Sequence, residues 1–118
     1  MREQGCGLLP VVDAANNVVG VLTDRDIVVR VCAGSCANER TAISDVMSRS
    51  IVSCSPDDSL DAAEELMISR QKQRILVLER GKLVGVLSVT DIAQVEQPLK
   101  VARLVRQVTA RELRLEHA

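Results

Sequence analysis

The chain has 118 residues and a formal net charge of −1, with 47% hydrophobic and 26% charged residues. This balance is typical of a globular protein, and the near-zero charge disfavours nucleic-acid binding because phosphates need a basic surface. Phe, Tyr and Trp are absent, which also argues against single-strand binders that stack bases on aromatic rings. Since no apolar run approaches 18 residues and no signal peptide opens the chain, we expect a cytoplasmic protein with no membrane partner.

An internal repeat organises the chain. Residues 8–13 align with residues 74–79, and residues 19–27 align with residues 84–92. Each copy predicts a strand, a tight turn, a returning strand and a helix. The first strands are expected at 8–12 and 75–78, buried on both faces, and the returning strands at 18–22 and 83–87.

Turn and glycine positions support the two hairpins. Asn16-Asn17 and Arg80-Gly81 can supply the positive φ that a hairpin turn needs. Gly20 and Gly85 lie inside the returning strands, where a missing side chain often marks the close approach of a ligand or another backbone.

A helix is predicted after each hairpin. Thr23 with Asp26, and Ser88 with Asp91, have the spacing of a capping box, in which side chain and backbone satisfy each other across the first turn. The first of these helices is expected to run to a stop at Gly34. A short helical lead-in at 43–47 and a strand at 51–53 are expected to follow.

Two further helices are predicted. One opens at residues 58–61, and we expect its acidic residues to form a solvated face: Asp57, Asp58, Asp61, Glu64 and Glu65. The other follows Pro98 and is basic and amphipathic, with Leu113 and Leu115 in its last part. Packing against the rest of the chain is favoured over membrane binding, because the helix has no bulky aromatic side chain to insert. The expected boundaries are 1–36 and 37–97 for the two copies and 98–118 for the last helix.

The cysteines do not predict a metal site. Cys6, Cys32, Cys36 and Cys54 contain no C-x-x-C spacing, and His117 is the single histidine. We therefore expect reduced thiols that folding does not require, no metal and no cysteine–histidine catalytic pair.

The repeated motifs resemble the cystathionine-β-synthase (CBS) domain. Residues 8–27 are similar to the second half of such a domain, and residues 43–91 are similar to a whole one, including Asp45-Val46-Met47 and Gly85-Val86-Leu87-Ser88. The pair resembles a Bateman module whose first repeat is incomplete at its N-terminus. The resemblance implies an α/β fold with pseudo-two-fold symmetry and small sheets flanked by helices. It also implies a homodimer and a regulatory role.

The resemblance implies an adenosyl ligand, such as AMP, ADP, ATP or S-adenosylmethionine, in clefts between the repeats, and no required cofactor. An aspartate at a helix start can accept from ribose hydroxyls, while hydroxyl and arginine groups can hold phosphate. In the complete cleft, Thr23, Arg25 and Asp26 are expected to face a slot formed by the other copy: Ser53, Cys54, Ser55, Lys72 and Gln73. A plain helix cap with no ligand is the alternative for these motifs.

The second cleft is expected to be impaired. Ser88 and Asp91 would face the opening strand of the first copy, which this sequence lacks, and no arginine lies between them. Leu76 and Glu79 also replace a proline and an aspartate that are common in the family. The missing strand leaves an edge that a partner chain, the last helix or an upstream segment could cover.

Two functions from different classes follow. The first is a regulatory module that binds an adenosyl ligand, and the second is a structural dimerisation module without a ligand. An enzyme is poorly supported, because the sequence shows no activated nucleophile, metal set or acid–base pair.

Overall fold

The computed structural model describes residues 1, 6–32 and 41–110. The chain divides into two compact units, one of Met1–Ile51 with Gly81–Leu83 and one of Val52–Arg80 with Val84–Ala118. Each unit has a small sheet, helices and a buried apolar cluster of its own. This arrangement confirms the predicted α/β class, while the expected repeat boundary at 36/37 stays a prediction.

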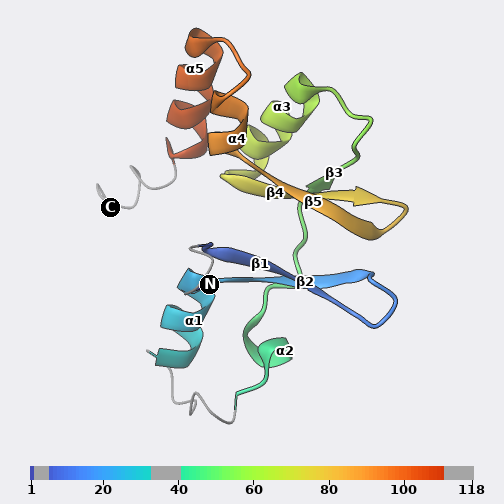
Figure 1. The fold of residues 1–118 in the computed structure, drawn as a ribbon. Helices are drawn as coiled ribbons and strands as arrows, with labels where there is room; N and C mark the ends of the chain where they lie inside the picture. Colours follow the sequence, from blue (N-terminus) through green and yellow to red (C-terminus); the bar gives the residue numbers. More distant parts are fainter. Residues whose placement is uncertain (2–5, 33–40, 111–118) are drawn as a thin grey trace. The chain divides into compact units, whose positions relative to one another are not determined.

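The first unit is built on an antiparallel hairpin of β1 (Leu8–Val12) and β2 (Val18–Thr23) (Figure 1). The turn is held by Asp13, whose Oδ1 accepts from the N–H groups of Ala15 and Asn17, both at 2.9 Å. Asn16 has the positive φ predicted there, 65°. A carboxylate that accepts from the next residues in this way is a common means of closing a turn.

Short helical segments complete the first unit. β2 leads into α1 (Asp24–Ile27), which continues as one π-helical turn, η1 (Val28–Cys32), and α2 (Ile43–Val46) follows. The predicted stop at Gly34 lies outside the described residues. The core of this unit joins side chains from β2, η1 and α2: Leu22, Val31 and Val46.

Gly20 marks a close backbone approach, as predicted. On the edge of β2 away from β1, Val21 and Ser48 exchange two backbone hydrogen bonds of 2.9 and 2.8 Å. A Cβ on Gly20 would lie 2.7 Å from Met47 Sδ and 2.8 Å from the Ser48 carbonyl oxygen. Both separations are too short for real atoms, so a glycine is what lets residues 47–48 cross the strand.

The second unit holds a three-stranded sheet in the order β3 (Ser53–Cys54), β4 (Arg74–Glu79), β5 (Lys82–Ser88). β3 runs parallel to β4. β4 and β5 are joined at Arg80 and Gly81, whose φ angles of 53° and 79° are those of a tight primed turn. Among the described residues, the sheet of the first unit has two strands, β1 and β2.

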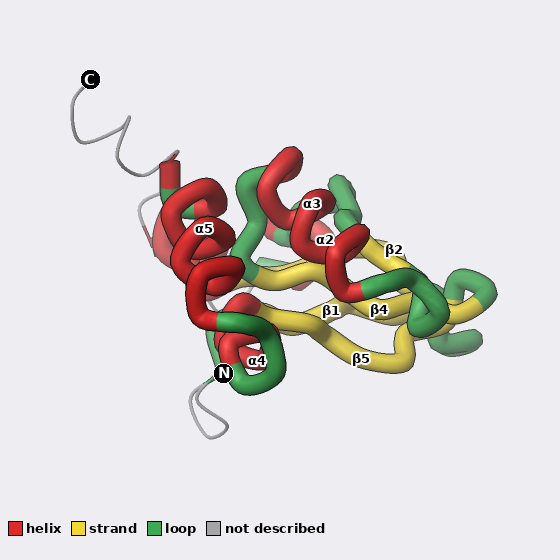
Figure 2. The backbone as a smooth tube through the Cα atoms, turned by 90° about the horizontal axis from the view of Figure 1, so that it is seen from above, coloured by secondary structure: helices red, strands yellow, loops and turns green. Residues whose placement is uncertain are grey.

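Three helices cover one side of the β4–β5 hairpin: α3 (Leu60–Arg70), α4 (Val89–Ala93) and α5 (Pro98–Val108) (Figure 1). α5 packs against both α3 and α4 (Figure 2). Their shared core is almost fully buried and apolar: Ala63, Met67, Ile75, Ile92, Leu104 and Val108. The expected packing role of the last helix is therefore confirmed, although its predicted leucines at 113 and 115 lie outside the described residues. No helix in the described part of the chain combines the length and apolarity needed to cross a bilayer.

Four sequence expectations are corrected. β1 is not buried on both faces, since Leu9 and Val12 are exposed. The strand expected at 51–53 forms later and is shorter, at Ser53–Cys54, although the Val52 carbonyl oxygen also accepts from the Leu76 N–H of β4 at 3.0 Å. Glu64 is not part of a solvated acidic face, because α5 covers that side of α3 and buries it. Gly85 marks no close approach, because no described atom lies within 4 Å of a Cβ built there.

The two strand glycines give a matched test of backbone approach. Gly20→Ala should lower the free energy of unfolding by about 1–3 kcal/mol, because Met47 and Ser48 must move to admit the methyl group. Gly85→Ala should be neutral or stabilising by up to about 1 kcal/mol, since alanine loses less chain entropy than glycine on folding. Urea unfolding of both variants measures the difference. Equal effects would contradict the assigned contact.

Candidate functional site

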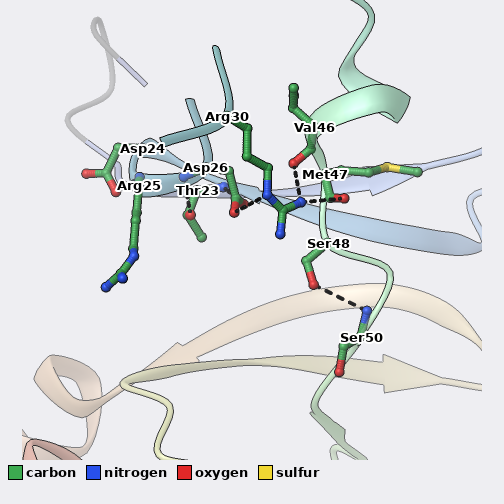
Figure 3. A network of polar contacts seen from close by, with 9 residues as sticks. All are labelled: Thr23, Asp24, Arg25, Asp26, Arg30, Val46, Met47, Ser48 and Ser50. Carbon is green, nitrogen blue, oxygen red and sulfur yellow. Dashed lines mark hydrogen bonds and ion pairs between the residues drawn. The ribbon is translucent and has the colours of Figure 1, made fainter. Parts of the chain in front are cut away.

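The junction between β2 and α1 forms the predicted capping box. Thr23 Oγ1 accepts from the backbone N–H of Asp26 at 3.1 Å, and Asp26 Oδ2 accepts from the backbone N–H of Thr23 at 2.9 Å (Figure 3). The arrangement fixes the Asp26 carboxylate at the helix start. A carboxylate offers about four lone-pair sites, so the cap leaves Asp26 with acceptor capacity for another donor.

Arg30 is a further member of this junction that sequence analysis missed. Its Nε lies 4.0 Å from Asp26 Oδ1, and its Nη1 donates to the carbonyl oxygens of Val46 and Met47 at 2.9 and 3.3 Å (Figure 3). The Asp26 side chain is only 15% exposed. The arginine thus links the capping carboxylate to the segment that crosses Gly20. The i,i+4 spacing from Asp26 was the available signal, but the two carbonyl contacts depend on the fold.

Arg25 is placed differently from Arg30. Its side chain extends away from Thr23 and Asp26 into solvent (Figure 3). Within residues 6–32 and 41–110, no carboxylate pairs with it. The guanidinium therefore keeps its donors available for an anion.

The junction between β5 and α4 repeats the capping box in the second unit. Ser88 Oγ accepts from the Asp91 N–H at 3.1 Å and donates to Asp91 Oδ2 at 2.9 Å, and the Ser88 N–H donates to the same oxygen at 2.9 Å. Asp91 is exposed, and its i+4 position is Val95. Where Asp26 has an arginine at this position, Asp91 has none, and no cation among the described residues pairs with it.

The other predicted site residues all belong to the second unit. Ser53 and Cys54 pair with Leu76 and Val77 of β4, and Ser55 accepts from the Asp57 N–H through its hydroxyl at 3.3 Å. Lys72 and Gln73 lie between α3 and β4, where the Gln73 carbonyl accepts from the Val89 N–H at 3.0 Å. This bond brings Gln73 next to the Ser88 junction. That these five residues complete a site with Thr23 and Asp26 stays a prediction.

The structure describes the side chains of two of the four cysteines. Cys6 and Cys54 are free and half-buried, whereas the side chains of Cys32 and Cys36 lie outside the described residues. Burial, followed by the nearby Asp58 carboxylate, raises the pKa of the Cys54 thiol. A thiol with a raised pKa is a weak nucleophile at neutral pH. Cys54 is therefore suited to a packing role and not to nucleophilic catalysis.

A second polar cluster lies between α3 and α5 and was not anticipated. Asp61 and Glu64 of α3 and Glu96, just before α5, each place a carboxylate oxygen within 4.8 Å of the others. Burial, and then the adjoining Glu96 carboxyl group, raise the pKa of Glu64 to about 7. The i,i+3 spacing of Asp61 and Glu64 was visible in the sequence, but the approach of Glu96 depends on helix packing.

Comparisons with known proteins agree with this architecture. The family model of the CBS domain matches residues 1–32 and 43–97. The CBS domain-containing protein YhcV of Bacillus subtilis is 37% identical over 93 residues, which cover 79% of this chain and 65% of YhcV. The protein MK0525 of Methanopyrus kandleri is 30% identical over 109 residues, covering 92% of this chain and 55% of MK0525. The chain thus spans about half to two thirds of the length of these relatives.

Solved structures share the fold. A CBS-domain-containing protein from Agrobacterium tumefaciens superposes with a TM-score of 0.68 at 28% identity, over 79% of this chain and 74% of that one. The CBS domain pair of protein MJ0100, solved in complex with 5′-methylthioadenosine and S-adenosyl-L-methionine, gives a TM-score of 0.67 at 21% identity, over 79% and 72% of the two chains. On the family match and the repeated strand–turn–strand–helix units, this chain belongs to the CBS-domain family.

Proposed function

We propose that the chain is a regulatory module that binds an adenosyl ligand, such as AMP, ADP, ATP or S-adenosylmethionine. The observation that carries the proposal is the capping-box aspartate Asp26, a carboxylate held in place at a helix start with acceptor capacity to spare. Ribose presents two adjacent hydroxyl donors, which a fixed carboxylate can accept together. The two adenosyl compounds bound by the related MJ0100 domain pair support this ligand class.

The proposed ligand contacts follow from the chemistry of each side chain. Asp26 accepts from the ribose, while Thr23 and Arg25 donate to a phosphate or to another polar group beyond it. Arg25 suits this role because it is exposed and has no carboxylate partner among the described residues. The remaining contacts, to the base and its surroundings, are proposed for residues of the second copy: Ser53, Cys54, Ser55, Lys72 and Gln73.

Ser88 and Asp91 are proposed as a weaker site. Their capping box is equivalent in its bonds to that of Thr23 and Asp26. Asp91, however, has neither an arginine beside it in the turn nor one at i+4. Without neighbouring cations, the carboxylate repels an anionic nucleotide, which lowers the affinity of the site.

The alternative function, a structural dimerisation module without a ligand, draws on exposed valines along β5. Val84 and Val86 are 53% and 40% exposed on the strand where Gly85 has no neighbour. Apolar edge strands of this kind are commonly covered by another chain. A homodimer is compatible with both functions, so ligand binding is what distinguishes them.

We expect a homodimer, because pairing of two copies is the commonest way to cover such an edge. Light scattering coupled to size exclusion should give twice the monomer mass at micromolar concentration. A monodisperse monomer would contradict this expectation and would leave the ligand proposal standing.

A thermal-shift screen tests the ligand proposal first. Adenosine, AMP, ADP, ATP, NAD and S-adenosylmethionine are each added to the full chain. A ligand at a hundredfold excess over its dissociation constant should stabilise the protein by about 2.7 kcal/mol, because it binds only the folded state. No shift with any of these compounds would favour the structural module.

Paired aspartate variants then assign the site. Asp26→Ala should lower the affinity for the stabilising ligand tenfold or more, since losing a charged acceptor costs about 1.5–3 kcal/mol. Asp91→Ala should change the affinity little. Each variant loses the same capping bond of 2.9 Å and about 1 kcal/mol of stability with it. Asp26→Ala also loses the ion pair with Arg30, and Asp91→Ala loses the bond from Ser88 Oγ.

Calorimetric titration well below both melting points measures the difference. Asp26→Asn serves as a control that keeps an oxygen for the cap while removing the charge, and it should bind as weakly as Asp26→Ala. Loss of binding in Asp91→Ala with retention in Asp26→Ala would show that the two sites have been assigned the wrong way round.

A further inference from the structure

The carboxylate cluster between α3 and α5 contains one buried oxygen that no donor group reaches. Glu64 is only 7% exposed, and its buried Oε2 has no hydrogen-bond partner. A buried carboxylate oxygen without a partner is costly, since it has lost its water and gained nothing in return. A carboxylate oxygen of Glu64 lies within 4.8 Å of one from Asp61 and one from Glu96. When Glu64 is protonated, its carboxyl group shares a hydrogen bond with Glu96.

The surroundings of the cluster admit a small ion. A pocket of about 300 Å³ adjoins it, lined by residues of α3 and α5 that include Asp61, Glu64 and Lys100. Asp61 is exposed and Glu96 half-buried, which gives an ion a path from solvent to Glu64. The site lies wholly within the second unit and shares no residue with the proposed adenosyl site.

We propose that Asp61, Glu64 and Glu96 form a binding site for one divalent cation of the hard, oxygen-preferring class, with Ca²⁺ as the ion that fits best. Carboxylates alone make up the donor set, which favours Mg²⁺, Ca²⁺ or Mn²⁺ over zinc and copper. Ca²⁺ binds oxygens at about 2.3–2.6 Å, so two ligands on opposite sides lie roughly 4.6–5.2 Å apart. The carboxylate oxygens of the cluster all lie within 4.8 Å of one another, which is compatible with that span. Ca²⁺ also accepts irregular coordination and several carboxylates, whereas Mg²⁺ demands near-ideal octahedral geometry.

The Lys100 ammonium group would compete with such an ion for the carboxylates of the cluster. Its Nζ lies 3.0 Å from Asp61 Oδ1 and 4.0 Å from Glu96 Oε2, yet it leaves Glu64 Oε2 without a partner. The lysine side chain is 49% exposed and flexible, so it can swing into solvent when a cation enters. A cation held among the three carboxylates would satisfy the oxygen that the lysine does not reach.

The direct test is calorimetric titration of Ca²⁺ into the full chain after treatment with EDTA and its removal, with Mn²⁺ paramagnetic resonance as an independent readout. We expect one ion per chain with a dissociation constant on the order of 0.1–1 mM, the range of weak calcium modules. Glu64→Gln, which keeps the side-chain shape, should weaken binding at least tenfold. Lys100→Gln, which removes the competing cation, should strengthen it several-fold.

Glu65→Gln is the matched control. Glu65 neighbours Glu64 on α3 but is exposed and pairs with Arg103 at 3.3 Å, outside the carboxylate cluster. Its substitution should leave the affinity unchanged. The proposal is overturned if neither the wild type nor Lys100→Gln binds Ca²⁺ or Mn²⁺ at 5 mM. It is also overturned if Glu65→Gln weakens binding as much as Glu64→Gln, since that result would show diffuse attraction to an acidic surface.

Discussion

In both copies of the repeat, one hydrogen bond sets the geometry of the junction between the returning strand and the next helix. It joins an aspartate carboxylate to the backbone N–H three residues before it. In each unit the returning strand ends at a hydroxyl residue, Thr23 or Ser88, which is the N-cap of the next helix. The carboxylate of Asp26 or Asp91, in the first turn of that helix, bonds back to the N-cap residue. The bond satisfies a backbone donor that the helix start would otherwise leave open. It also holds a strong hydrogen-bond acceptor in one position, where it can accept from the ribose hydroxyls of the proposed ligand. Stability and the proposed function therefore depend on the same atoms.

The two units use this junction in different surroundings. In the first, Arg30 ties Asp26 to the carbonyl groups of Val46 and Met47, and Ser48 pairs with the free edge of β2 across Gly20. In the second, nothing in the described chain occupies the equivalent place beside Gly85. The two copies are thus similar in sequence but differ in the residues that surround each junction. For this reason the sites at Asp26 and Asp91 are proposed to differ in their affinity for the ligand.

Sequence patterns predicted the features that depend on nearby residues. Both capping boxes, the positive φ at Asn16, Arg80 and Gly81, and the strand–helix order follow from spacings of a few residues. The features that were missed depend on residues brought together by packing. Arg30 reaches carbonyls 16 and 17 residues away, and Glu64 meets Glu96 only because α5 packs against α3. Gly85 was predicted wrongly for the same reason. Its sequence context matches that of Gly20, but no described segment packs against it as residues 47–48 pack against Gly20.

The central claim is that an adenosyl ligand binds at the junction that begins with Thr23. The most direct measurement is the change in backbone amide resonances when the stabilising nucleotide is titrated into the labelled full chain. The account predicts saturable shifts at Thr23, Arg25 and Asp26, with further shifts at residues 53–55, before any change at Ser88 and Asp91. Shifts confined to Ser88 and Asp91, or saturable binding that leaves both junctions unperturbed, would contradict it.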